Sequence, residues 1–319
     1  MAKRKKKFIN KLASFAFVLA IFTFVVLANA NTQLDLGLPI PEFDGITKTA
    51  QNVKENIKEV AAKVDAQVHF IDVGNADCTL IKSGSQVILI DAGENDDEQK
   101  VVEYLNRQNV TKIDYLIPTH MHADHIGGMD KVVEKFDVEN IIMTRLPQEL
   151  VPTTATYKSL LQAISDKGIK PIAAKAGQEY ELENAKITVL APSKDYDELN
   201  ATSVVIKFES GDFSMIVGGD ATKITESDIL RAGFDLECDI YKVQHHGSST
   251  SNSQKYIDAI SADYYYIPVG KDNSYNHPHK EVIKRLEATG KPVYRADKNG
   301  DVVFKVKGDN ITVKCEKEG

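Results

Sequence analysis

A histidine-rich loop that directly follows an apolar run is the feature that most constrains the fold of this chain. The run IDYLI (113–117) leads into PTHMHADHIGG (118–128), which holds three of the chain's eight histidines and one aspartate between its first and last histidine. An apolar run, a polar loop and a glycine pair before a charged segment are typical of a buried strand, a loop and a helix. We therefore expect a buried strand to present this loop at its end.

The remaining apolar runs predict further strands that alternate with helices. Three short β-rich runs between residues 68 and 93 (VHFIDVG, CTLIKSG and QVILIDAG) predict a meander of strands. Farther along, SVVIKFESGDFSMIVGGD predicts a hairpin that turns at Gly211-Asp212, and the C-terminal segment predicts one that turns at Asn299-Gly300. Helical patterns separate many of these runs. We expect a two-sheet core with helices outside, in one α/β domain over residues 66–319.

The first 30 residues have the order of a secretory signal peptide. A basic start precedes the uncharged apolar run Leu12–Ala28, and Ala28-Asn29-Ala30 forms a small-residue cleavage site. We expect cleavage after Ala30; the alternative is an uncleaved membrane anchor, because the run is nearly long enough to span a bilayer. Residues 31–65 then form a linker and a stalk helix. In both cases we predict a secreted or membrane-anchored extracytoplasmic protein whose only membrane contact is this segment.

Charge and cysteine content narrow the classes of function. The first 30 residues carry six basic and no acidic side chains, so without them the net charge of −7 becomes −13. Such an acidic chain is not a general polyanion binder. The three cysteines are far apart and form no CxxC pair, which argues against a cysteine-built zinc site or a disulfide framework. We interpret Cys78 and Cys238 as core residues and His69 as structural, and no feature predicts a stable protein partner.

The histidine-rich loop carries the donor atoms of a metal centre. Neutral imidazole and carboxylate groups suit zinc, manganese or iron. The two-residue spacing lets His120 and His122 face one ion from an extended segment. Asp124 and His125 can face a second ion about 3.5–4 Å away, the separation of two-metal hydrolases. We therefore expect two divalent ions, zinc or manganese, rather than a run of surface histidines.

Further aspartates and histidines stand at the ends of predicted strands, which would deliver their side chains to the same edge. An aspartate beside glycine is usually a turn residue, so each position alone would be ambiguous. Together with the loop, however, these positions leave His69 as the only histidine outside the candidate clusters. The additional candidates are Asp91, Asp220, His245, His246, His277 and His279.

The segment THMHADHIGG resembles the metal-binding loop of the metallo-β-lactamase superfamily. More narrowly, VHFIDVGNADCTLI, LNATSVVIKFESGDFSMIVGGDA, YKVQHHGSSTS and NSYNHPHKEVIKRL are similar to the hydrolase domain of ComEC-type DNA-uptake competence proteins and of its free-standing secreted relatives. The likeness runs in the same order from about Val68 to Val306. It implies a four-layer αββα sandwich with the metals at the edge between the two sheets.

The resemblance also implies roles for single residues. Asp91 resembles the strand-end aspartate that orients the histidine loop without binding metal. His245 resembles a histidine that donates a proton to the leaving group, and His246 could exchange roles with it. The implied metal ligands are His120, His122, Asp124, His125, the bridging carboxylate Asp220, and His277.

Two departures from the family pattern concern this site. Many members supply a further histidine ligand between the loop and the bridging aspartate, but no histidine lies between His125 and Asp220. The corresponding segment is LNATS, where Asn200 and Ser203 are candidate catalytic residues, and one ion is expected to be weakly held. VGNADC replaces the usual Gly-Gln-Gly-Asp, which leaves the role of Asp77 open.

These features together predict an exported metal-dependent hydrolase. The favoured hypothesis is attack by a metal-activated hydroxide on a phosphodiester of nucleic acid or of a nucleotide, because of the competence resemblance. Two alternatives stay open. One is hydrolysis of a lactone, a β-lactam or another acyl substrate, and the other is a non-catalytic exported accessory protein with a weakened metal site.

Overall fold

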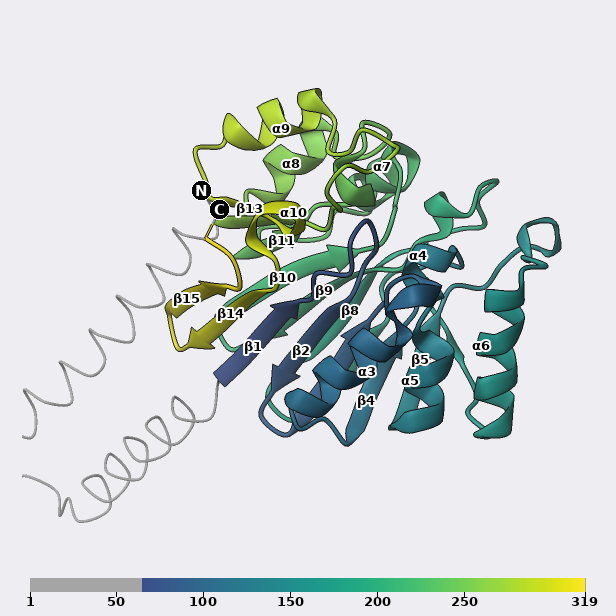
Figure 1. The fold of residues 1–319 in the computed structure, drawn as a ribbon. Helices are drawn as coiled ribbons and strands as arrows, with labels where there is room; N and C mark the ends of the chain where they lie inside the picture. Colours follow the sequence, from purple (N-terminus) through teal and green to yellow (C-terminus); the bar gives the residue numbers. More distant parts are fainter. Residues whose placement is uncertain (1–64, 319) are drawn as a thin grey trace, which may run out of the picture. The chain divides into compact units, whose positions relative to one another are not determined.

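Two mixed β-sheets form the centre of residues 65–318, the part of the chain that the computed structural model describes (Figure 1). The predicted signal peptide at 1–30 and nearly all of the predicted stalk at 31–65 lie outside these residues. Within the described part, none of the helices combines the length and the apolar character that crossing a membrane requires.

The first sheet joins an antiparallel half to a parallel half, in the order β15-β14-β1-β2-β3-β4-β5-β6. β1, β2 and β3 pair antiparallel as the predicted meander, and β4 and β5 continue the sheet parallel to β3. The strands are β1 (Asp65–Phe70), β2 (Thr79–Ser83), β3 (Gln86–Ile90), β4 (Lys112–Ile117), β5 (Asp137–Met143), β6 (Ile172–Ala173), β14 (Val302–Lys307) and β15 (Asn310–Cys315).

The second sheet has the order β13-β12-β11-β10-β9-β8-β7 and is parallel from β10 to β13. β9 and β10 form the hairpin predicted at Gly211-Asp212, since Ser210 pairs with Phe213. The strands are β7 (Glu179–Glu181), β8 (Lys186–Ala191), β9 (Val205–Ser210), β10 (Phe213–Gly218), β11 (Ile240–Lys242), β12 (Tyr264–Ile267) and β13 (Val293–Arg295).

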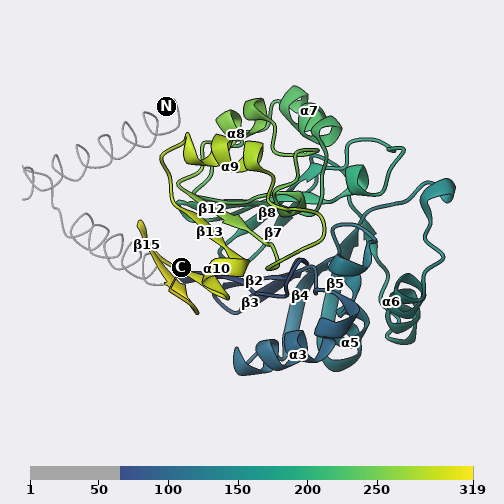
Figure 2. The same ribbon diagram turned by 45° about the horizontal axis from the view of Figure 1, so that its top comes forward.

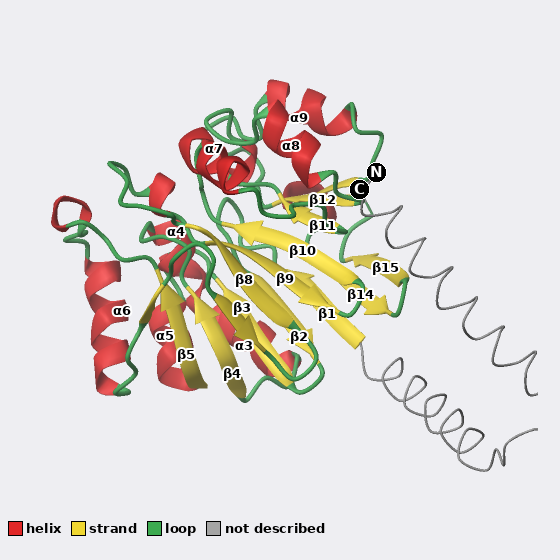
Figure 3. Ribbon diagram, turned by 180° about the vertical axis from the view of Figure 1, so that it is seen from behind, coloured by secondary structure: helices red, strands yellow, loops and turns green. Residues whose placement is uncertain are grey.

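Three hydrophobic clusters define the order of the layers. The inner cluster lies between the sheets, where Phe70 of β1 stacks on Tyr266 of β12 at a ring-centroid distance of 4.1 Å. Successive strand residues point to opposite faces, so Ile81 belongs to this inner cluster and its neighbour Leu80 to an outer one. Helices cover both outer faces, as the two rotated views show (Figures 2 and 3). The predicted αββα sandwich is confirmed.

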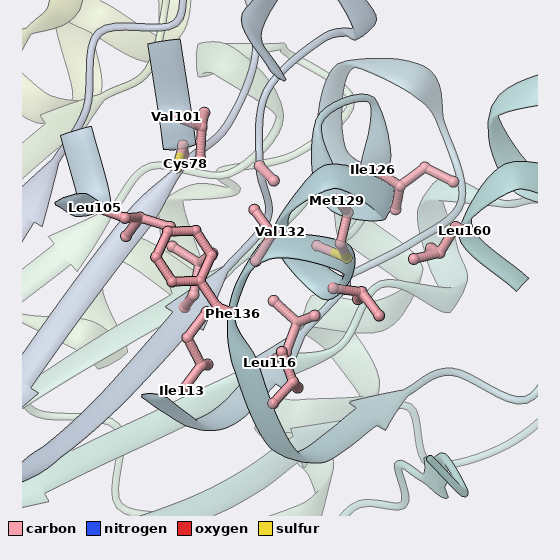
Figure 4. Packing of buried hydrophobic residues seen from close by; sticks show 14 of the residues in the cluster. Cys78, Val101, Leu105, Ile113, Leu116, Ile126, Met129, Val132, Phe136 and Leu160 are labelled. Carbon is pink, nitrogen blue, oxygen red and sulfur yellow. The ribbon is translucent and has the colours of Figure 1, made fainter. Parts of the chain in front are cut away.

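Amphipathic helices cover the two outer faces. On the first sheet, Leu105, Met129, Val132 and Leu160 come from helices and pack over strand residues such as Leu116 (Figure 4). These helices are α3 (Glu98–Arg107), α4 (Ala123–Ile126), α5 (Met129–Lys135) and α6 (Ala155–Asp166). On the second sheet they are α7 (Lys223–Ala232), α8 (Gln254–Ile260) and α9 (Lys280–Glu287). The short elements are η1 (Asn95–Asp97), η2 (Gln148–Leu150), η3 (Asn200–Thr202), η4 (His245–Gly247) and α10 (Ala296–Asn299).

The C-terminal hairpin lies elsewhere than the sequence predicts. Asn299-Gly300 does not join paired strands, because β13 belongs to the second sheet and β14 to the first. The Asn299 side chain instead accepts the backbone N–H of Arg295 and closes the short helix α10. The actual hairpin joins β14 to β15, with Lys307 paired to Asn310. A local turn signal could not reveal that the chain changes sheets at this point.

His69 makes a structural contact in the first sheet, and it gives a testable pH dependence. The buried imidazole bonds to the Tyr104 hydroxyl at 2.9 Å. Burial, with help from Lys82 and Lys305, lowers its pKa from 6.5 to about 4. The unfolded chain therefore binds a proton between pH 6.5 and 4 that the folded chain excludes, so His69 costs stability as the pH falls through this window, up to about 3 kcal/mol.

We expect His69→Phe to flatten the pH dependence of the unfolding free energy between pH 6.5 and 4, as measured by urea denaturation. The quantity compared is the slope of the unfolding free energy against pH in the variant and in the unaltered protein. The other histidines are expected to contribute equally to both slopes. The Tyr104→Phe variant, which keeps the imidazole, serves as control. Parallel curves for His69→Phe and the unaltered protein would show that His69 is protonated in the folded state.

Candidate metal centre

The candidate residues converge at one edge of the two sheets, in loops that follow strand ends. The histidine loop follows β4, and Asp91 follows β3, so both come from the first sheet. Asp220 follows β10, and the turn η4 follows β11, so these come from the second sheet. Across the two sheets, His246 Nε2 lies 3.2 Å from Asp124 Oδ2, although the two residues are 122 positions apart in the sequence.

Asp91 holds the His125 ring in one orientation from behind the loop. One carboxylate oxygen accepts the backbone N–H of Thr119, and the other accepts both the Thr119 hydroxyl and the His125 Nδ1–H, each at 2.8 Å. Because Nδ1 carries the proton, His125 presents the lone pair of Nε2 to the cluster. This geometry suits the orienting role that the resemblance implies for Asp91.

The Asp220 carboxylate lies at the centre of the cluster, with each oxygen facing different histidines. Oδ1 is 3.3 Å from His125 Nε2 and 3.8 Å from His246 Nε2. Oδ2 is 3.9 Å from His120 Nε2 and 3.4 Å from His245 Nε2. Asp220 can therefore contribute one oxygen to each of two neighbouring cations.

Two neighbours fix this position of Asp220. Its backbone N–H donates to the Ser203 hydroxyl at 3.0 Å. The preceding Gly219 lies against the histidine loop, where a Cβ would come within 2.2 Å of the Thr119 hydroxyl. Only glycine permits this approach between the two sheets. Ser203, a predicted catalytic residue, thus supports the carboxylate, and Asn200 lies in the same segment with its side-chain oxygen buried and unbonded within the described part of the chain.

Four donor atoms cluster on the Oδ1 side. They belong to Asp124, His125, Asp220 and His246, and all lie within 4.8 Å of one another. Asp124 Oδ2 is 3.5 Å from His125 Nε2 and 3.2 Å from His246 Nε2. The buried His246 donates its Nδ1–H to the Pro268 carbonyl at 2.7 Å, which leaves Nε2 as the donor that faces the cluster. Two imidazoles and two carboxylates form a suitable set for a borderline divalent cation.

The unsatisfied atoms of this side fit a metal ion. His125 Nε2 and Asp220 Oδ1 are buried and have no hydrogen-bond partner within residues 65–318. Buried polar atoms without partners are rare in proteins and call for a bound ion or water. Burial alone would lower the pKa of His125, but the carboxylates of Asp124, Asp220 and Asp91 raise it well above its usual value. The same field favours a bound cation.

The Oδ2 side gathers the other imidazoles. His120 Nε2 lies 3.0 Å from His122 Nδ1 as well as facing Asp220. His245 approaches from the second sheet, with its Nδ1 at 3.0 Å from the Thr250 hydroxyl. Burial lowers the pKa of His245, so its imidazole is neutral near pH 7. His245 therefore joins His120 and His122 on the Oδ2 side of Asp220.

His277 lies beside the cluster and outside the group of four donors. Its ring centroid is 5.5 Å from that of His245 and 6.2 Å from that of His246. In this arrangement His246, and not His277, belongs to the group of four clustered donors. The histidine pair has a left-handed backbone, with φ of 51° and 50°, and its two side chains face different oxygens of Asp220.

A buried ion pair behind the cluster is the feature that sequence reasoning missed. Lys242, in β11, is 1% exposed, and its ammonium contacts Asp77 and donates to the Gly218 carbonyl at 2.8 Å. Asp77 in turn lies 3.5 Å from His125 Nδ1 and 3.8 Å from His246 Nδ1. The lysine supplies the positive charge here, so we do not regard the nearby carboxylates as a further ion site. A lysine inside the apolar run IYKV was the available signal.

The model of the "Metallo-beta-lactamase superfamily" matches residues 71–271, which include every candidate residue named above except His277 and His279. The chain belongs to the metallo-β-lactamase superfamily. The cluster around Asp220 lies within the matched residues. The expected family is confirmed, whereas the role of each single residue stays a prediction.

Two curated relatives of this superfamily member are competence proteins. ComE operon protein 3 of Bacillus subtilis is 27% identical over 262 residues, which cover 76% of this chain and 33% of the relative. Competence protein ComA of Neisseria gonorrhoeae is 28% identical over 250 residues, covering 77% and 33%. The chain thus spans about a third of the length of these relatives, and the resemblance to ComEC-type competence proteins is confirmed.

Solved structures agree on the metallo-β-lactamase fold. CmlA, a diiron β-hydroxylase from Streptomyces venezuelae, superposes with a TM-score of 0.52 at 12% identity and covers 76% of this chain and 54% of its own. The metallo-β-lactamase fold protein YhfI from Bacillus subtilis gives a TM-score of 0.50 at 14% identity, covering 76% and 100%. At such low identities these matches concern the fold alone.

Proposed function

We propose that this chain is an exported phosphodiesterase that depends on two divalent ions and cleaves nucleic acid or nucleotides. The proposal rests on the Asp220 carboxylate, whose two oxygens each face different histidine side chains. Similarity to proteins named for competence supports nucleic acid as the substrate class. The signal-like N-terminal segment supports a location outside the cytoplasm, secreted or anchored by that segment. No stable protein partner is proposed.

The residues on the two sides of Asp220 would hold the two ions, either zinc or manganese. Bound ions would supply Lewis acidity toward a phosphoryl oxygen and an activated water as nucleophile. Asp91 accepts the Nδ1–H of His125, and the Pro268 carbonyl accepts the Nδ1–H of His246, so Nε2 is the nitrogen of each ring that would bind an ion. The roles are assigned as His120, His122 and His245 on the Oδ2 side, and Asp124, His125 and His246 on the Oδ1 side.

The position of His245 bears on the alternative of a decayed accessory protein. That alternative rested on a missing histidine between the loop and Asp220. His245 Nε2 lies 3.4 Å from Asp220 Oδ2 and so adds an imidazole to the side on which His120 and His122 lie. A complete donor set on both sides favours the catalytic proposal over the accessory one.

The decisive test combines metal content with hydrolysis of a simple phosphodiester. We expect the purified chain to bind two ions by mass spectrometry and to hydrolyse bis-p-nitrophenyl phosphate with manganese or zinc, with activity lost in EDTA and restored by metal. The double variant His122→Ala/Asp124→Ala is the inactive control. Two bound ions with turnover of p-nitrophenyl acetate or a lactone, but none of the phosphodiester, would overturn the proposal in favour of acyl hydrolysis.

A further inference from the structure

An exposed aromatic ring stands at the border of the metal centre. The side chain of Tyr275 is 66% exposed, more than the other exposed large hydrophobic side chains of residues 65–318, which are Val151, Leu161 and Ile224. One face of the Tyr275 ring stacks on His277, with centroids 5.6 Å apart and planes inclined by 19°. Leaving such a ring in water is unfavourable, so its other face is suited to a ligand.

The stack continues from Tyr275 into the metal centre. The His277 ring lies nearly parallel to His246, at 6.2 Å and 20°. His246 is one of the four clustered donors beside Asp220. Three rings in succession therefore connect the candidate reaction centre to the surface. A planar group placed on Tyr275 would lie only two rings away from the group under attack.

The loop that carries Tyr275 is held in place by hydrogen bonds. Within it, Asn273 donates to the Gly270 and His277 carbonyls at 3.0 and 2.8 Å and accepts the His277 N–H at 2.9 Å. The loop is also bonded to the turn that carries the histidine pair: the His279 N–H donates to Gly247 at 3.0 Å, and the Ser249 N–H donates to the His279 ring at 2.8 Å. The ring is therefore preorganised relative to the donors.

Two exposed lysines flank the loop that carries Tyr275. Lys271 and Lys280 stand at the two ends of the loop, and both are exposed. Neither makes an ion pair within the described residues. Asp272 and Glu281 directly follow these lysines, so the segment 271–281 is neutral overall, and its two ammonium groups are the positions that can meet the phosphates of a ligand.

We propose that Tyr275 is a stacking platform for an unpaired base beside the scissile phosphate, so that the substrate is single-stranded nucleic acid. The inference rests on the proposed phosphodiesterase function. An aromatic ring next to basic side chains is the arrangement that binds single strands with little sequence preference. Bases within a duplex are already stacked on both faces and cannot cover Tyr275 without being displaced.

Fluorescence tests base stacking without relying on turnover. The chain contains no tryptophan, so Tyr275→Trp introduces a single reporter at this position. In EDTA, a single-stranded oligothymidylate is expected to quench this fluorescence, whereas an oligonucleotide of the same length with abasic residues at every position is expected to leave it unchanged. Equal quenching by the two oligonucleotides would overturn the inference.

Kinetics separate failure of this inference from failure of the proposed function. For the metal-loaded protein, we expect Tyr275→Ala to raise the KM for single-stranded oligonucleotide between about 5- and 150-fold, with Tyr275→Phe close to the unaltered protein. Leu161→Ala, which removes another exposed side chain, serves as control. Unchanged KM in Tyr275→Ala would refute the platform alone. No cleavage of any oligonucleotide or nucleotide by the unaltered protein would refute the proposed function as well.

Discussion

Replacing His246 by alanine is expected to remove one of the two divalent ions and to lower phosphodiester turnover by at least roughly a thousand-fold, since a metal contributes several kcal/mol of transition-state stabilisation. The reason is the group of four donors on the Oδ1 side, from which His246 contributes Nε2. Nδ1 of His246 donates to Pro268, so within residues 65–318 its Nε2 faces the carboxylates of Asp124 and Asp220. Metal content by mass spectrometry is the direct measurement.

His277→Ala is the matched control for this prediction. His277 is the histidine that the resemblance assigns as the last ligand, yet it lies outside the group of four donors. We expect this variant to keep both ions while its effect on turnover is smaller. The reverse result, with an ion lost in His277→Ala and retained in His246→Ala, would show that the assignment by resemblance is right and that the geometry misleads.

Lys242→Met is expected to destabilise the fold by about 3–5 kcal/mol. Removing one partner of a buried ion pair leaves the other charge uncompensated, which costs this much in other proteins. Here the stranded charge is Asp77, which is 1% exposed and lies behind the metal centre. The unfolding free energy from urea denaturation, measured in EDTA so that bound metal does not contribute, gives the cost.

A double-mutant cycle distinguishes the lost pair from a simple packing defect. Lys242→Met combined with Asp77→Asn removes both charges, so most of the cost should be recovered, with a coupling energy of at least about 1 kcal/mol. Lys207→Met is the matched control, because Lys207 is also buried but its ion-pair partners Glu209 and Asp235 are substantially exposed. Additive effects of the two changes at 242 and 77 would contradict an energetically coupled pair.

The sandwich was predictable because its signals are local. Period-two alternation marks strands such as β2, where Leu80 and Ile81 face different layers. The turn at Gly211-Asp212 lies between two strands that pair with each other, and the short-range signal is sufficient there. At Asn299-Gly300 the same kind of signal misleads. The strands on either side, β13 and β14, belong to different sheets, and the residues between them do not determine this.

The candidate site was predictable as a set of residues but not as an arrangement. Spacing within the loop brings His120 to His125 together, and strand ends indicate Asp91 and Asp220. The side-chain directions of His245 and His246 depend on two successive left-handed backbone conformations. The residue types at these positions do not predict such a backbone. Lys242 and Asp77 are more than 160 positions apart and meet only because the two sheets pack together. A single sequence does not reveal such a contact.

Because the candidate ligands come from both sheets, ions bound among them would tie the two halves of the domain together. Asp220, His245 and His246 come from the second sheet, and the remaining donors come from the first. Anything that binds the folded state alone stabilises it by mass action, by about 4 kcal/mol when its concentration exceeds the dissociation constant a thousand-fold. Resistance of the chain to proteolysis would then follow the concentration of free metal around it.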